Sequence, residues 1–297
     1  MNAELLFLCA LVLWIALPWG PGHHLEFAER VLRRKRELLP ARVADLLGAE
    51  RQAYYYGNIA ADIITFKGYG GQYNHCHRWE IVNEMRELSD SPRQEAFILG
   101  YLSHLAADTI AHNHFVPYHL ARYARTKGLG HLYWEMNADR FVNESRWEII
   151  PKLKELHDLH ELDQLVNRTV PKKALPMRAN KMLFNHVLLV SERDMYRKGI
   201  ARLHPLDSVK LDRGFLAKFQ RAAVDRIRLA LHPSGMRKLA IVDPNGKAAQ
   251  AKALTLRESI LHRWAPGRMR TEHSAALAAP FLEGMETPPR ATKTRAH

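Results

Sequence analysis

The sequence has little cysteine, which bears on both its scaffold and its chemistry. Only two cysteines occur in 297 residues, Cys9 in an apolar leader and Cys76 between two histidines. Disulfide frameworks need several cysteines that can pair, so we do not expect disulfides to hold this chain together. Cys76 stays a candidate soft ligand for zinc, whose sites combine thiolate and imidazole.

Long apolar runs are also missing. The run from Leu5 to Trp19 has 15 residues, whereas a membrane-spanning helix needs ~20. A run of this length is typical of a signal-peptide core, so residues 1–18 predict export to the periplasm or out of the cell. Glu4 but no Lys or Arg precedes the run, and no A-x-A cleavage motif precedes Trp19. The alternative is an uncleaved N-terminal membrane anchor.

Strand-like alternation is scarce, and the sequence has no repeat at a solenoid period. Apolar residues instead recur at helical spacing, which predicts an all-α protein. Residues 54–74 are rich in Tyr, Gly and Asn, which predicts a loop. The basic, Pro-interrupted chain beyond residue 264 predicts a disordered tail. The expected helices comprise two within 24–47, one each over 79–88, 93–112, 131–141 and 147–165, and two or three within 180–232.

Charge is distributed unevenly. Residues 1–150 hold 16 Lys and Arg against 17 Asp and Glu, while residues 151–297 hold 28 against 14. The two halves therefore carry −1 and +14. This asymmetry predicts an acidic partner for the C-terminal half, either an anionic membrane surface or nucleic acid, although no base-reading motif is present. The predicted organisation is a leader at 1–18, a core at 19–150, a basic helical region at 151–263 and the tail at 264–297.

Histidine is abundant and clustered, which indicates metal chemistry. Nine of the 17 histidines lie between residues 23 and 131. In GYLSHLAADTIAHNHFVP, His104 and Asp108 are four residues apart, so they project from one face of a helix. GHLYWEMNAD repeats this spacing with His131 and Glu135. Because a buried carboxylate on an apolar helix needs a counter-charge, and imidazole dominates the set, the two pairs predict zinc rather than magnesium or calcium.

The residues leave the third ligand of this stretch open. Ideal helix geometry aligns His112 with His104 and Asp108. A helix that ends ahead of Pro117 would instead let His114 turn inward. Periodicity prefers His112, while an early helix end prefers His114.

The ordered set of motifs resembles the bacterial zinc-dependent phospholipase C family, which is related to single-strand-specific zinc nucleases and 3′-nucleotidases. The resemblance covers roughly residues 19–141. It implies an all-helical fold with three Zn²⁺ ions and the family pattern H-x3-D-x5-H followed by H-x3-E. The residues matching that pattern are His104, Asp108, His114, His131 and Glu135.

The resemblance also implies ligands upstream. WGPGHHLEFAERVL resembles the opening segment of the family, with Trp19 and His24 as ligands and His23 as the substitute. In YGNIAADI the loop aspartate corresponds to Asp62. In YNHCHRWE the histidine corresponds to His77, with His75 as its rival. In secreted members the ligand is the free amino group of an N-terminal Trp, which exists here only if cleavage falls before Trp19.

From this resemblance we expect hydrolysis of a phosphodiester in a phospholipid headgroup. Apart from Trp19, the ligand set comprises five neutral imidazoles and three carboxylates, so three Zn²⁺ ions would leave a site charge of +3. In the hypothesis, Asp108 bridges two zinc ions and Asp62 orients or deprotonates the attacking water. The alternatives are a zinc-dependent single-strand nuclease or 3′-nucleotidase, and a non-catalytic, membrane-associated zinc-binding protein.

Overall fold

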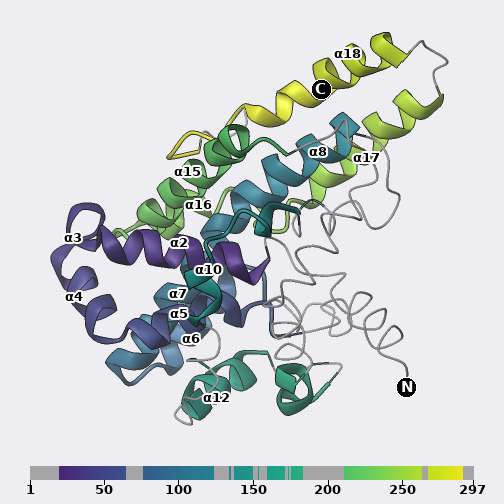
Figure 1. Cartoon of the computed structure of the whole chain (residues 1–297). Coiled ribbons are helices and arrows are strands. Elements are labelled where there is room, and N and C mark those ends of the chain that lie inside the picture. Colours follow the sequence, from purple (N-terminus) through teal and green to yellow (C-terminus); the bar gives the residue numbers. More distant parts are fainter. Residues whose placement is uncertain are drawn as a thin grey trace.

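The computed structural model describes residues 20–64, 76–123, 134, 137–149, 153, 159–170, 173, 175–182, 211–262 and 267–289. In these residues the regular structure is helical and no strand occurs, which confirms the predicted all-α class. Figure 1 shows how the helices are arranged. The helices are α2 (Pro21–Arg33), α3 (Lys35–Leu38), α4 (Ala41–Ala49), α5 (Arg51–Ala60), α6 (Glu80–Leu88), α7 (Pro92–Ile110), the π-helical turn η2 (Ala111–Phe115), α8 (Val116–Tyr123), α10 (Glu144–Trp147), α12 (His160–Thr169), α15 (Arg213–Ala230), α16 (Gly235–Leu239), α17 (Lys247–His262), α18 (Gly267–Ala278) and the 3-10 turn η4 (Ala279–Leu282).

The long helix α7 lies at the centre of the fold. Ser91 caps its N-terminus by accepting a hydrogen bond from the Gln94 amide at 3.2 Å, and Pro92 occupies the first turn. From Ala96 to Ile110 every residue is buried, as expected for a helix that is apolar on nearly all sides. Helices α5 and α15 pack against it. Side chains on α7 therefore face other helices rather than solvent.

Two glycines set the distance between α5 and α7. A Cβ on Gly57 would lie 2.0 Å from the Phe97 carbonyl oxygen, and one on Gly100 would lie 2.2 Å from that of Tyr54. The two backbones touch at this crossing. The prediction of a loop over residues 54–74 was therefore wrong for Tyr54 to Ala60, because the Gly that weakens a helix in isolation here allows close packing.

We expect Gly100→Ala to lower the free energy of unfolding by about 1–3 kcal/mol or more, because the added methyl group meets backbone that has no room to move. Thermal unfolding of the metal-free protein measures the effect. Gly48→Ala on α4 is the matched control, since its Cβ meets only the flexible end of Lys35 at 2.0 Å. That variant should be neutral or slightly stabilised. Equal unfolding temperatures for both variants would contradict the close-packing argument.

The C-terminal residues pack onto the same centre. Helix α15 contacts α7 and α2, while α17 and α18 contact α8, and Figure 1 shows these helices side by side. Where the sequence predicts a disordered tail, the structure has α18 and η4, with Phe281 buried. The alanine-rich stretch before Phe281 favours a helix, and that ring anchors it, although large apolar residues are few.

Several predicted features lie outside the described residues. They include the leader, residues 65–75 of the expected loop, residues 131–133 and 135–136 of the expected helix at 131–141, and residues 183–210. Within the described part of the chain, none of the helices is both long enough and apolar enough to cross a membrane.

Candidate metal centre

Helix α7 contributes a histidine and a carboxylate one turn apart. His104 and Asp108 are both fully buried, and the Nε2 atom of His104 lies 3.1 Å from Oδ2 of Asp108. The shared face follows from the helical period of the sequence. An unpaired carboxylate at this depth would be costly, so Asp108 requires cationic or hydrogen-bonding neighbours.

Helix α5 and the turn after it bring the second carboxylate. Asp62 follows α5, its amide donating to the Ile59 carbonyl at 3.2 Å, and its Oδ1 lies 3.8 Å from Nε2 of His104. On α5 itself, the Asn58 carbonyl lies 2.9 Å from Nδ1 of His104. Because a carbonyl only accepts, Nδ1 of His104 carries the proton. Nε2 of the neutral ring then presents a lone pair to the two carboxylates.

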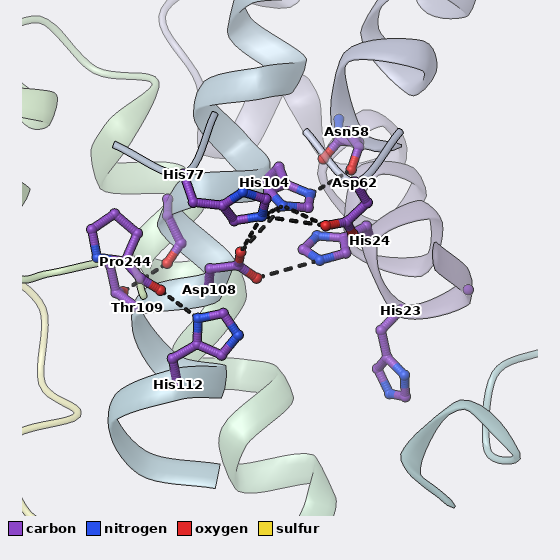
Figure 2. A network of polar contacts seen from close by, with 12 residues as sticks. His23, His24, Asn58, Asp62, His77, His104, Asp108, Thr109, His112 and Pro244 are labelled. Atoms are coloured by element: carbon purple, nitrogen blue, oxygen red, sulfur yellow. Dashed lines mark hydrogen bonds and ion pairs between the residues drawn. The ribbon is translucent and has the colours of Figure 1, made fainter. Parts of the chain in front are cut away.

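Two more histidines come from α2 and from the turn before α6. His24 stacks on His104 with ring centroids 3.9 Å apart, and its Nε2 lies 3.4 Å from Oδ1 of Asp108. His77 places Nε2 at 3.1 Å from Nε2 of His104, 3.3 Å from Oδ1 of Asp62 and 3.5 Å from Oδ2 of Asp108. Figure 2 shows the five side chains gathered in one place.

The electrostatics favour the metal-binding forms of His24 and Asp108 and favour positive charge at His104. Burial lowers the pKa of His24, and the neighbouring His104 acts in the same direction, so His24 stays neutral. Burial would raise the pKa of Asp108, but His104 and His112 outweigh it and hold that pKa well below its usual range. For His104, burial alone would lower the pKa, yet Asp108 and Asp62 raise it. The two carboxylates thus favour a positive charge at His104, and a metal cation would supply such a charge at the same place.

The residues fit zinc. Neither ring nitrogen of His24 and neither oxygen of Asp108 makes a hydrogen bond, although all four atoms are buried. Two sets of ligand atoms lie within 4.8 Å of one another, one formed by His24, Asp62 and His104 and the other by His77, His104 and Asp108. Imidazole nitrogens with a few carboxylate oxygens are the ligands that zinc prefers. The lone pairs of these nitrogen and oxygen atoms would otherwise repel one another. A cation bound among them would attract all of these lone pairs.

His23 and His24 are neighbours on α2 but face different surroundings. Nδ1 of His23 lies 2.6 Å from Oδ1 of Asp139, and Nε2 lies 3.0 Å from Nε2 of Gln220. Asp139 also accepts hydrogen bonds from the amides of Gly22 and His23, at 3.3 and 3.2 Å. The Asp139 carboxylate therefore caps the start of α2. Figure 2 shows His23 turned away from the cluster.

The structure separates His112 from His114. The helix does not end ahead of Pro117, as one prediction required, but continues through η2 into α8. His112 lies next to Asp108, with Nδ1 2.5 Å from the Pro244 carbonyl (Figure 2). His114 instead places Nδ1 2.9 Å from the Phe281 carbonyl, and burial lowers its pKa to about 4.

Four of the sequence candidates are not among the described residues: Trp19, His75, His131 and Glu135. Cys76 is buried, and it belongs to neither of the two ligand sets. Its carbonyl accepts a hydrogen bond from the Tyr101 hydroxyl at 2.6 Å. Sequence reasoning missed the carbonyls of Asn58 and Pro244, because a backbone acceptor leaves no mark on residue type.

A buried cluster of histidines and aspartates in a helical scaffold is typical of metalloproteins whose ions are held by imidazole and carboxylate groups. Comparison with known families specifies it further, since the family model described as zinc dependent phospholipase C matches residues 23–174. The match spans half of the chain, and the chain belongs to this family. At family level this supports a zinc-dependent hydrolase of phospholipase C type. Neither the curated proteins nor the solved structures contain a match.

Proposed function

We propose that this protein cleaves the phosphodiester bond between the glycerol and the headgroup of a phospholipid, at a centre of three zinc ions. The main support is the buried convergence of His24, Asp62, His77, His104 and Asp108 in a chain of this family. With two carboxylates in this set, two or more divalent cations would leave a positive centre. Such a centre would attract a phosphodiester.

The two ligand sets share His104, and Asp108 lies close to a histidine of each. Its Oδ1 faces His24, while its Oδ2 faces His77 and His104. A carboxylate that offers its two oxygens to different partners is suited to bridge two ions. Asp62 would be a further ligand for the ion near His77. For the third ion, the candidates are His131 and Glu135 with either His112 or His114. Trp19 is the remaining candidate ligand for the ion near His24.

Zinc, when bound, would supply Lewis acidity that polarises the phosphoryl group and lowers the pKa of water. We assign Asp62 the role of orienting the attacking water and accepting its proton. The water oxygen forms a bond to phosphorus as the bond from phosphorus to the glycerol oxygen breaks. The glycerol oxygen takes up the proton that Asp62 accepted, so the products are a diacylglycerol and a phosphorylated headgroup.

Exchange of Asp62 for Asn tests the role of this carboxylate. Asn keeps an oxygen that can bind metal but cannot accept the proton, so we expect kcat to fall about 10²–10⁴-fold while zinc is retained. Turnover of phosphatidylcholine and zinc content, measured on the same protein, give the result. Asp45→Asn is the control, because Asp45 lies on the exposed surface of α4 and pairs with Arg36. Wild-type turnover in Asp62→Asn would remove the proposed role.

The substrate class needs a separate comparison. Phosphatidylcholine and single-stranded DNA are offered to the zinc-loaded wild type, and the proposal expects the lipid to be cleaved. Cleavage of DNA alone would favour the nuclease alternative. A zinc-loaded protein that cleaves neither would favour a non-catalytic zinc-binding protein. A protein that binds no zinc would overturn the mechanism itself.

We further propose that the protein is exported and acts at an anionic membrane surface. The apolar leader supports export. Exposed cations on α16 and at the start of α17, Arg237, Lys238 and Lys247, support attraction to acidic headgroups. Turnover on vesicles with and without phosphatidylglycerol, at low and high salt, checks the second point. The rate should rise with anionic lipid and lose that gain as salt screens the charges.

A further inference from the structure

Four consecutive residues between α16 and α17 form hydrogen bonds with His77, with His112, or with a residue close to one of them in the chain. The Val242 carbonyl accepts from Trp79 Nε1 at 2.9 Å, and the Asp243 carbonyl accepts from Asn113 Nδ2 at 2.8 Å. The Pro244 carbonyl lies 2.5 Å from Nδ1 of His112. Asn245 donates its side-chain amide to the His77 carbonyl at 2.8 Å. We refer to residues 242–246 as the clasp segment.

The clasp segment reaches the centre because of Gly246. Its φ is +58°, in the left-handed region, and a Cβ there would lie 2.2 Å from the His112 carbonyl oxygen and 2.6 Å from the His112 Cβ. Any side chain would push the segment away from η2. The segment is also fixed internally, since the Asp243 carboxylate accepts from the amide of Asn245 at 3.0 Å.

We infer that the clasp segment is a positioning element of the zinc centre, although it lies outside residues 23–174 that match the family. This inference rests on the proposed function. The Pro244 carbonyl fixes the proton of His112 on Nδ1, which leaves Nε2 as the ligand atom. Asn245 holds the backbone of His77. The carbonyls of the clasp segment also hold Trp79, near His77 in the chain, and Asn113, next to His112. The C-terminal half thus takes part in the metal centre.

Asn245→Ala removes the amide that holds His77 and leaves every proposed ligand in place. We expect the zinc dissociation constant to rise about 10-fold or more, the usual effect of losing a group that orients a ligand. It is measured on the stripped full-length protein by competition with a chelating dye. Substituted Co²⁺ should show a changed absorption spectrum, because its ligand geometry is altered. Gly246→Ala should act in the same direction and more strongly.

Asn143→Ala is the matched control. Asn143 is an exposed asparagine whose side chain also bonds backbone, accepting from the Ser145 amide at 3.0 Å at the start of α10. Its loss should lower the unfolding temperature of metal-free and zinc-loaded protein alike, with zinc affinity and the cobalt spectrum unchanged.

The outcomes separate the inference from the proposed function. If Asn245→Ala and Gly246→Ala both bind zinc as the wild type does, with the wild-type cobalt spectrum, the inference is overturned, while the hydrolytic function stands on wild-type turnover. If the wild type itself binds no zinc, both fall. Weaker zinc binding in the clasp variants but not in Asn143→Ala supports the inference, whether or not phospholipid is the substrate.

Discussion

Asp108→Asn protein should bind little zinc and lose phosphodiester hydrolysis by about 10³-fold or more. Asp108 faces His24 with one oxygen and the pair of His77 and His104 with the other. Its carboxylate would supply negative charge to cations bound near either group of histidines. Metal ions contribute several kcal/mol to such reactions, and each ~1.4 kcal/mol is a factor of ten in rate. Loss of the shared carboxylate should therefore affect more than one ion.

Zinc content by atomic spectroscopy and phosphatidylcholine turnover measure this effect. Zinc should also raise the unfolding temperature of the wild type, since it binds only the folded protein, and should not do so for Asp108→Asn. Asp163→Asn is the control. Asp163 is a buried carboxylate that bonds Tyr56 and Lys181 instead of the metal centre. Wild-type zinc content in Asp108→Asn would remove Asp108 from the ligand set.

His112→Ala should lower the number of zinc ions bound and reduce turnover at least about 100-fold, while His114→Ala should do neither. His112 has the arrangement of a metal-binding histidine, with Nδ1 bonded to the Pro244 carbonyl, as Nδ1 of His104 is bonded to Asn58. His114 is held by the Phe281 carbonyl beside Arg226 and Glu286. This geometry favours His112 as the ligand that the family pattern implies to be His114.

The two variants act as each other's control, because they remove the same ring from the same π-helical turn. His114→Ala loses one buried hydrogen bond and should cost ~1 kcal/mol of stability. Zinc stoichiometry and kcat are measured on both proteins. If His114→Ala loses zinc and His112→Ala keeps it, the assignment to His112 is wrong and the H-x3-D-x5-H pattern holds.

Local pattern accounts for much of the fold. Helical periodicity predicts α6 and α7, and the structure has both, with Ser91 capping α7. Periodicity fails where a tertiary contact overrides a local preference. Gly57 predicts a loop, but packing on Gly100 stabilises α5. Alanine-rich α18 lacks the apolar residues that would predict it, and Phe281 anchors the chain beyond it.

The sequence by itself determined the pair of His104 and Asp108, because their shared face depends only on the period of one helix. It also predicted a metal site in this stretch, since a buried carboxylate among histidines favours a cation. The approach of His24, Asp62 and His77 depends on how α2, α5 and the turn before α6 pack on α7, and only the family resemblance anticipated it. The preference for His112 and the proposed part of residues 242–246 come from tertiary structure alone, because backbone carbonyls distant in sequence act through position and not through residue type.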